Sequence, residues 1–335
     1  MKKSAYRIIN YSLLIFNCFV SSAQLKWINV DSLYQPLPAS IHIFKSNDSL
    51  EGKPNIAFYV IADLKDKNIL FDVDTTLKRR LKPSQFFEKN DQPLVVVNCT
   101  FFSFQTNQNL TVVIKDRKLV SYNVQSLTKP GGRDSTTDNF PFRSAVGIRK
   151  NRTVDIAWLF SDSLRRWPIA YEVAVKPTKI GSLKNFDLQK TVPVDQKIKK
   201  FSSNEFVSKW KMQTAVGGGP VLLQEGKINI TNEEEMMFVG KRINEREPRT
   251  TMGYTNDNKL IILVVQGRFP GIAEGATLTQ EAQLLKDLGC WEALNLDGGG
   301  SSCLLINGKE TIKPSDATGQ RPVPAVFIIK EKGKR

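Results

Sequence analysis

One short segment constrains the fold of this chain more than any other. Residues 293–306 read Ala-Leu-Asn-Leu-Asp-Gly-Gly-Gly-Ser-Ser-Cys-Leu-Leu-Ile, so two apolar runs flank a carboxylate, three glycines and two serines. A hairpin turn needs only one or two such residues, and consecutive glycines cost the most backbone entropy. That cost is expected where the backbone closely approaches a ligand, because successive N–H groups at a strand end can bind an anion. We therefore predict an anion site at Gly298, Gly299, Gly300 and Ser301, with Asp297 beside it as an acid, a base or a metal ligand.

The first 23 residues have the composition of a secretory leader. Three basic residues precede a short apolar stretch at 11–20, and Ser21-Ser22-Ala23 is a small-residue cleavage site. The stretch is too short to span a membrane, and no later segment is long enough to be a membrane helix. Lipidation at Cys18 is the less favoured alternative, because large residues precede it. We expect an exported chain, periplasmic or extracellular, that begins at Gln24 after cleavage near Ala23.

The chain is basic, with a formal net charge of +15 that falls to +12 once the three cations of the leader are removed. Its lysines and arginines are scattered, with short clusters at 78–80 and 197–200. An exported protein seldom meets nucleic acid, and the chain has no run of basic and aromatic residues that would stack bases. We therefore expect no nucleic-acid partner, and the positive charge favours an anionic ligand.

Histidine and cysteine usage narrows the chemistry. The one histidine, His42, lies in a strand-like stretch at 40–45, so a Ser-His-Asp or Cys-His mechanism would depend on it alone. A site with two histidines is excluded. Three cysteines remain after cleavage, Cys99, Cys290 and Cys303, and their spacing is not that of a zinc site. If the chain is an enzyme, its catalytic groups are therefore expected to be carboxylates, arginines, asparagines, hydroxyls and backbone N–H groups. No cofactor is predicted, although Asp297 could bind a divalent cation.

The hydrophobic pattern is rich in strands. Helices are expected at 77–88, 204–212 and 277–288, and the last has a capping box formed by Thr277 and Gln280. The pattern predicts an α+β fold, with a mixed β-sheet core and a few covering helices, in a single domain over residues 24–335. Residues 127–142 read as a long loop. The strands are predicted at 56–62, 94–97, 111–114, 221–223, 260–266 and 326–330.

A weak internal repeat connects two arginines with two glycine triplets. Arg143 and Arg249 each precede a hydroxyl residue, an apolar run and a polar turn, and the glycine triplets at 217–219 and 298–300 each precede a hairpin-like run. If the repeat is real, both arginines and both glycine triplets face one common binding site. Since an arginine fork holds a phosphate or carboxylate with two parallel hydrogen bonds, we predict anion binding there. The predicted residues of this half of the site are Arg143, Arg249, Thr250, Gly218 and Gly219.

Other polar positions have weaker signals. Asn98 ends the buried-looking run 95–97, and polar residues at the ends of central strands often contact ligands. Cys99 is expected to be a small buried residue, because no histidine is at hand to activate it. The acidic run at 233–235 reads as the solvated start of a helix.

The chain resembles the phosphodiester glycosidase family in six segments, which occur along the chain in the same order as in that family. The resemblance covers residues 94–329 and is most specific at 295–302. It implies an α+β fold and hydrolysis of a sugar-1-phosphodiester without an essential histidine. The family commonly has small residues where this chain has Cys99 and Thr100, which implies a reshaped pocket. The six segments are 98–102, 143–147, 217–220, 248–253, 295–302 and 321–324.

We therefore expect an exported hydrolase whose partner is a sugar-phosphate diester. The predicted catalytic residues are Asp297, Arg249 and Asn98; Asp297 acts as a base toward water or as an acid toward the leaving oxygen. Glycosidases usually use two carboxylates, and the candidates for the second are Glu247, Asp195 and Asp316. The alternative is a non-catalytic exported binder of an anionic glycan or cell-wall polymer.

Overall fold

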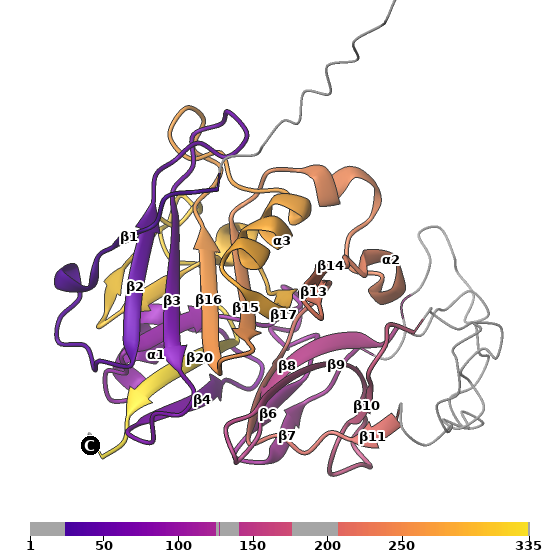
Figure 1. Ribbon diagram of the computed structural model, residues 1–335. Coiled ribbons are helices and arrows are strands. Elements are labelled where there is room, and N and C mark those ends of the chain that lie inside the picture. The colour runs from indigo at the N-terminus through magenta and orange to yellow at the C-terminus, as the bar shows by residue number, and fades with distance from the viewer. Residues whose placement is uncertain (1–23, 125–126, 128–140, 176–206, 334–335) are drawn as a thin grey trace, which may run out of the picture.

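The structure, a computed structural model, describes residues 24–124, 127, 141–175 and 207–333 (Figure 1). The predicted leader, most of the predicted loop at 127–142, the basic cluster at 197–200 and Asp195 lie outside these residues. Within the described ranges, no helix is long and apolar enough to cross a membrane.

Three sheets make up most of the described chain. The eight-stranded sheet has the spatial order β1 (Ile28–Asn29), β2 (Ile41–Ser46), β3 (Ala57–Asp63), β16 (Lys259–Val265), β15 (Arg249–Thr255), β17 (Cys290–Asn295), β13 (Val221–Gln224) and β14 (Lys227–Ile228). The seven-stranded sheet has the order β11 (Val207–Lys209), β10 (Ile169–Tyr171), β9 (Val154–Phe160), β8 (Arg143–Ile148), β12 (Thr214–Gly217), β6 (Val113–Lys115) and β7 (Lys118–Ser121). The five-stranded sheet has the order β19 (Lys309–Glu310), β18 (Leu304–Ile306), β5 (Val95–Asn98), β20 (Ala325–Glu331) and β4 (Ile69–Thr75).

The predicted combination of sheets with few helices is confirmed, and all six predicted strands are present with small shifts at their ends. The sheets are not mixed in direction, however, because every strand pair in the described part of the chain is antiparallel. Antiparallel neighbours need only short connections, which agrees with the many hairpins of this chain.

The helices follow the sequence signals unevenly. Helix α3 (Leu278–Asp287) begins at Thr277 with the predicted capping box. Helix α1 (Pro83–Lys89) is shorter than predicted, because Pro83 takes the first helical turn, where its missing N–H costs nothing. The helix predicted at 204–212 is wrong: residues 207–209 form strand β11, which pairs with β10. The remaining short helices are α2 (Asn232–Glu235), η1 (Asp31–Leu33), η4 (Gly240–Asn244) and η5 (Gly299–Ser301).

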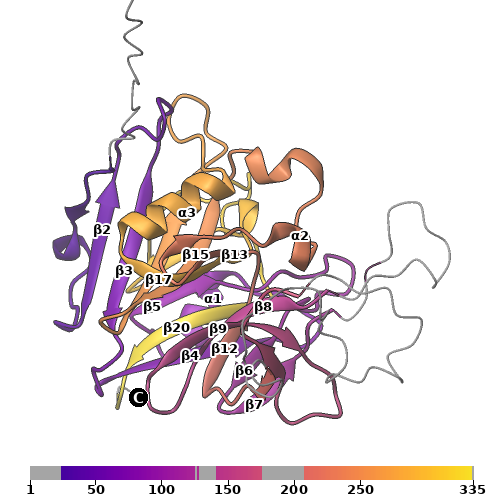
Figure 2. The same ribbon diagram turned by 45° about the vertical axis from the view of Figure 1, so that its right-hand side comes forward.

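The largest hydrophobic core lies between the three sheets, since each of them contributes buried side chains to it. Helix α3 covers the other face of the eight-stranded sheet, where it packs against β13 and β17 (Figure 1). Helix α1 covers the outer face of the five-stranded sheet, where Phe86 is fully buried. Figure 2 shows β4 and β20 beside β6 and β12, and the Thr214 hydroxyl joins these sheets through the Phe71 carbonyl.

The chain first passes from the eight-stranded to the five-stranded sheet between β3 and β4, and three later crossovers close a cycle. It leaves the five-stranded sheet after β5 and enters the seven-stranded one at β6; it leaves that sheet after β12 and enters the eight-stranded one at β13; it returns from β17 to β18. In each sheet the arriving strand pairs with the departing strand: β6 with β12, β13 with β17, and β18 with β5. Each glycine triplet of the predicted repeat lies at one of these crossovers, and Asn98 lies at the start of the other.

Candidate functional site

Asn98 joins two of the three crossovers. Its Nδ2 atom donates to the Asp297 carbonyl at 2.5 Å, and the Asp297 N–H donates to the Cys99 carbonyl at 2.9 Å. Its Oδ1 atom accepts from the Thr250 hydroxyl and from the Cys303 N–H, both at 3.0 Å. Asn98 is completely buried, so its contacts are those of a residue that positions the Asp297 loop. Its predicted part in catalysis stays a prediction.

The glycine triplet at 217–219 serves close approach between backbone segments. The Gly219 N–H donates to the Asn295 carbonyl at 2.7 Å, and the Gly218 N–H donates to the Ser144 carbonyl at 3.0 Å. A Cβ atom on Gly218 would lie 2.4 Å from the Asn295 carbonyl oxygen, and Gly219 has a φ of +124°. These two N–H groups are already used inside the fold, so the contacts do not support the predicted anion nest at Gly218 and Gly219.

The second triplet has a different environment. Gly299 donates its N–H to the Pro248 carbonyl at 2.8 Å and has a φ of +60°, which glycine adopts without strain. A Cβ atom on Gly298 would lie 2.8 Å from the Pro248 carbonyl, and one on Gly300 would lie 2.0 Å from Arg321 Nη2. The three glycines thus let the loop pass between the start of β15 and an arginine side chain.

Asp297 is the carboxylate at the centre of this loop. The residue is partly exposed, whereas its Oδ2 atom is buried without a hydrogen-bond partner among the described residues. Burial raises the pKa of Asp297 to about 7, although the Ser301 hydroxyl, the charge of Arg321 and the Gly298 N–H all act to lower it. A carboxyl group with a pKa near neutrality exchanges protons readily at neutral pH.

Two ion pairs border the loop, one on each side. Arg321 binds Asp316 through two hydrogen bonds of 2.7 and 2.8 Å, and its Nη1 atom lies 3.4 Å from the Ser301 hydroxyl. On the other side, Arg268 Nε donates to Glu247 at 2.6 Å, and the guanidinium group lies against Gly299. Two of the three carboxylates proposed as partners of Asp297 thus lie beside its loop.

Neither Arg321 nor Arg268 is among the site residues predicted from the sequence. Arg321 lies within one of the segments shared with the family, which was an available signal. Arg268 has only one distinguishing feature in the sequence, its place three residues after the buried strand β16. It adopts a left-handed backbone conformation with a φ of +67°.

Arg143 and Arg249 begin β8 and β15, as their matched contexts predicted. Arg143 Nη2 donates to the Met236 carbonyl at 3.4 Å, and the Arg249 guanidinium lies over the Phe238 ring at 5.9 Å. Both arginines therefore contact residues 236–238, and both are buried. Arg249 also donates to the carbonyls of Ala276 and Glu245, so part of its hydrogen-bonding capacity is structural.

Glu235 corrects the interpretation of the acidic run. The run 233–235 lies in helix α2, as expected, but it is not solvated throughout: the side chain of Glu235, the last residue of the helix, is completely buried. Five groups donate hydrogen bonds to its carboxylate at 2.6 to 3.1 Å, which offsets the burial that raises its pKa. Its donors are the Ser144 N–H and hydroxyl, the Trp158 indole N–H, the Val221 N–H and the Thr231 hydroxyl. Glu235 thereby fixes the start of β8, next to Arg143.

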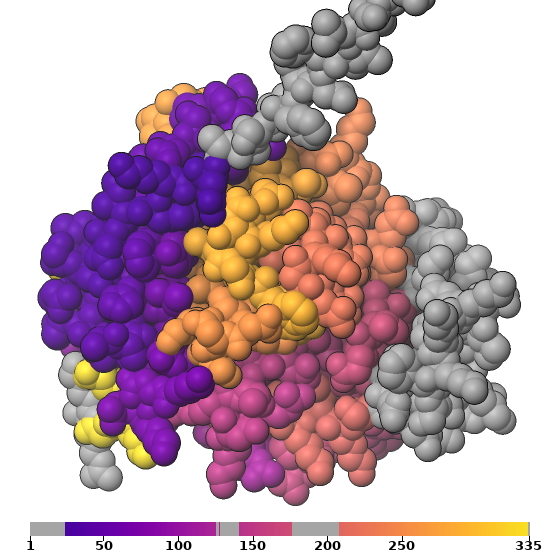
Figure 3. Space-filling model, viewed as in Figure 1, coloured from indigo at the N-terminus to yellow at the C-terminus, as the bar shows by residue number. Residues whose placement is uncertain are grey.

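A second buried glutamate lies behind Arg249. Glu281, on α3, is fully buried, and both of its carboxylate oxygens have no hydrogen-bond partner within the described ranges. Burial raises its pKa to about 8, and the nearby charge of Arg249 acts against this shift. Figure 3 shows residues of α3 beside the segment that carries α2 and η4 on the same face.

Other expectations concern residues away from the reacting centre. Cys99, Cys290 and Cys303 are free and buried, so the predicted burial of Cys99 is confirmed, and this burial raises the pKa of its thiol to about 12. Thr100 is buried as well. His42 Nδ1 lies 2.8 Å from the Asp31 carboxylate, on β2, between β1 and β3. The described residues contain no group of three or more His, Cys, Asp or Glu side chains that could hold a metal ion.

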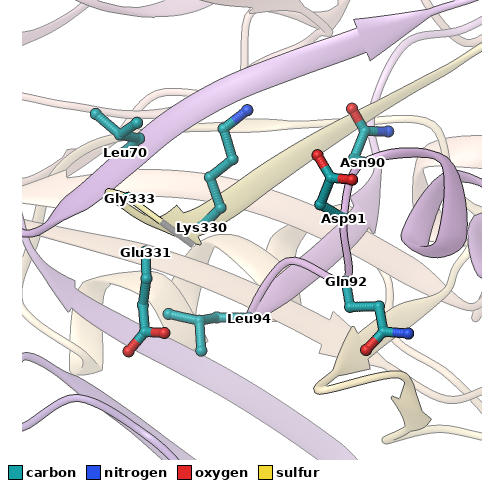
Figure 4. Close-up of a pocket in the computed structure, with 8 residues that line it drawn as sticks. All are labelled: Leu70, Asn90, Asp91, Gln92, Leu94, Lys330, Glu331 and Gly333. Carbon is teal, nitrogen blue, oxygen red and sulfur yellow. The ribbon is translucent and has the colours of Figure 1, made fainter. Parts of the chain in front are cut away.

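One pocket of the structure lies away from the candidate site around Asn98 and Asp297. A hollow of about 100 Å³ is lined by eight residues, among them Leu70, Asn90 and Lys330. Figure 4 shows their side chains. In the ladder between β5 and β20, Ile329 pairs with Val95, whereas Asn98 pairs near the other end of β20. The hollow therefore lies at the opposite end of these strands from Asn98.

Comparison with known proteins decides the family. The sequence profile for phosphodiester glycosidase matches residues 91–330. The chain belongs to the phosphodiester glycosidase family. It is 28% identical over 102 residues to mouse N-acetylglucosamine-1-phosphodiester alpha-N-acetylglucosaminidase, a match that covers 30% of this chain and only 19% of the mouse protein.

Solved structures share the fold. The catalytic domain of the zebrafish N-acetylglucosamine-1-phosphodiester alpha-N-acetylglucosaminidase superposes with a TM-score of 0.56 at 21% identity, over 92% of this chain and 89% of that one. A hypothetical protein from Synechocystis gives 0.58 at 15% identity, over 93% and 64% of the two chains. A Burkholderia pseudomallei protein described as exported gives 0.53 at 14% identity, over 85% and 75%.

Proposed function

We propose that this phosphodiester glycosidase is an exported hydrolase that cleaves the bond between a sugar and the phosphate of a sugar-1-phosphodiester. One observation carries the proposal: a carboxyl group with a pKa near 7, Asp297, lies in a glycine loop bordered by Arg321 and Arg268. Family membership supports a hydrolase of glycosyl phosphodiesters. The names of the mouse and zebrafish proteins support N-acetylglucosamine as the first sugar to test.

The reaction can be written with the residues of this site. The oxygen of a water molecule bonds to the anomeric carbon, and the carbon–oxygen bond to the phosphate breaks. The electron pair of that bond stays on the phosphate oxygen, so the products are a free sugar and a phosphomonoester. Asp297 takes the proton of the attacking water. A phosphate is already a good leaving group, so the main demand on the site is to stabilise negative charge on the phosphate.

Cationic groups meet that demand. Arg143 and Arg249 hold the phosphodiester, and both lie on the side of residues 236–238. The Ser301 hydroxyl and Arg321 lie next to Asp297 and bind the phosphate oxygens from the other side. Asn98 and Thr250 act through the backbone: they hold the Asp297 loop in register with β15.

A substrate panel tests the proposal. The purified protein is incubated with methyl diesters of several sugar 1-phosphates, and the products are separated by chromatography. Hydrolysis at the sugar side gives a free reducing sugar and methyl phosphate. Release of methanol with retention of the sugar phosphate would contradict the proposal. Saturable binding of the diesters without any turnover would instead favour the alternative, a non-catalytic binder of anionic glycans.

A further inference from the structure

An exposed aromatic ring lies next to the Asp297 loop, between two arginines. Phe104 is 61% exposed, although most large apolar side chains of this fold are buried. The Arg321 guanidinium lies 5.4 Å from the centre of its ring, and the Arg80 guanidinium lies 5.2 Å from it. Arg321 in turn reaches the Ser301 hydroxyl. The order of contacts outward from the reacting carboxylate is therefore Ser301, Arg321, Phe104 and Arg80.

The backbone holds this arrangement in place. Leu81 and Val323 exchange two hydrogen bonds of 3.0 and 2.8 Å, which ties the chain beside Arg80 to the chain beside Arg321. Phe104 lies in a tight turn of the first crossover, where the Ser103 N–H donates to the Gln108 carbonyl at 2.9 Å. The ring is thus presented by a turn that follows directly from β5.

The two arginines differ in their partners. Arg321 forms a two-bond ion pair with Asp316, so much of its charge is neutralised. Arg80 has no ion pair within the described residues; it packs on the rings of Phe102 and Phe104. An arginine that is held on aromatic rings keeps its hydrogen-bond donors free along the edge of the guanidinium plane. Arg80 is therefore a cation held in place without an acidic partner among the described residues. The Phe104 ring lies between it and Arg321.

We infer that Arg80, held by Phe104, binds a second anionic group on the leaving-group side of the substrate. This inference rests on the proposed function. Arg143 and Arg249 are buried against residues 236–238, and the proposed function assigns the scissile phosphate to them. Phe104 is exposed, so the second ester of the phosphate extends toward Phe104 and Arg80. The substrate class is thus a diester whose alcohol carries a further phosphate or carboxylate, as in a sugar–phosphate polymer.

A pair of substrates tests the inference. Both contain N-acetylglucosamine 1-phosphate; in one the second ester is to methanol, and in the other it is to the primary alcohol of glycerol 3-phosphate. Arg80→Gln should lower kcat/KM about tenfold for the glycerol phosphate diester and leave the methyl diester unchanged, because only the former has a second anion. Phe104→Leu should have the same selective effect. The loss should shrink as the salt concentration rises.

Arg79→Gln is the matched control, since it removes the same charge from the neighbouring, exposed position. Equal losses on both substrates, or equal losses in Arg79→Gln and Arg80→Gln, would overturn the inference. If neither diester is hydrolysed, the proposed function fails, and calorimetric binding of the glycerol phosphate diester decides the inference separately. Weaker binding by Arg80→Gln than by Arg79→Gln supports it, and equal binding overturns it.

Discussion

The side-chain amide of Asn98 donates a hydrogen bond of 2.5 Å to the backbone carbonyl of Asp297, across 199 positions of sequence. The same side chain accepts from Thr250 and Cys303. One buried amide thus fixes the end of β17 to the start of β15 and to β5, and it determines where the Asp297 carboxyl group can point.

Replacement of Asn98 by alanine should destabilise the protein by about 2–4 kcal/mol, because it leaves the Asp297 carbonyl and the Cys303 N–H buried without partners. Urea unfolding measures this loss. The exposed Asn229→Ala is the control and should change the free energy of unfolding by less than about 0.5 kcal/mol. Similar midpoints for the two variants would remove Asn98 from its positioning role.

Asp297→Asn should lower kcat by roughly 10²-fold or more, the scale expected for loss of a general acid or base. Binding of the phosphodiester should persist, because the arginines remain and a negative charge beside the phosphate is removed. Steady-state kinetics and calorimetry on the same preparation separate the two effects. Asp91→Asn, at an exposed position, is the control. A folded Asp297→Asn enzyme with near wild-type turnover would exclude this carboxyl group from the reaction.

The raised pKa of Asp297 also predicts a pH-dependent stability. The unfolded chain loses this proton near pH 3.8, whereas the native state keeps it until about pH 7. Between these values the native state binds more protons, so the contribution of Asp297 to stability falls as the pH rises through this window. Asp297→Asn lacks this loss. It should therefore gain stability relative to wild type from pH 4 to pH 7, by about 1–3 kcal/mol, with no further gain above pH 8. A constant difference in denaturant unfolding across this range would contradict the shift.

The two buried glutamates should respond oppositely to amidation. Glu235→Gln places an NH₂ group among five donors and should cost about 2–4 kcal/mol. Glu281→Gln should be nearly neutral at pH 6, because the pKa of about 8 keeps Glu281 protonated there. It should stabilise the protein at pH 9, where the wild-type carboxyl group must ionise in the interior. Equal effects of the two substitutions would show that the hydrogen-bond environments do not decide the charge states.

The leader predicts a defined mature end. Protein recovered from the exported fraction of its host should begin at Gln24 when its N-terminus is sequenced. The basic start, the short apolar stretch and the Ser-Ser-Ala sequence are the reason for this expectation. A retained Met1, or a lipid on Cys18, would contradict it.

The sequence was informative where the signal is local. The capping box at Thr277 and the strand entrances at Arg143 and Arg249 depend on a few neighbouring residues, and all three are present. The helix predicted at 204–212 failed because tertiary packing overrides local pattern: Trp210 and Met212 are buried against the seven-stranded sheet.

The environment of a residue could not be predicted from the sequence where it is set by groups far away along the chain. The three glutamates at 233–235 are indistinguishable in sequence, and Glu235 differs only because donors up to 91 positions away surround it. The two glycine triplets pose the same difficulty. Both allow close approach to protein carbonyls, which accept from the N–H groups of Gly218, Gly219 and Gly299, but the second triplet also lies between two arginines. Composition shows that something comes close to a glycine backbone and cannot show what it is.

The cyclic order of the three crossovers has a consequence for folding. Contacts at their meeting point join residues 76, 152 and 199 positions apart, so each requires the closure of a long loop. Such non-local contacts form slowly, after the hairpins that supply their strands. The reacting centre is then among the last parts of the molecule to assemble. On refolding, recovered activity should lag behind the far-ultraviolet signal of the strands, and a chain cut between any two crossovers should regain strands without regaining the site.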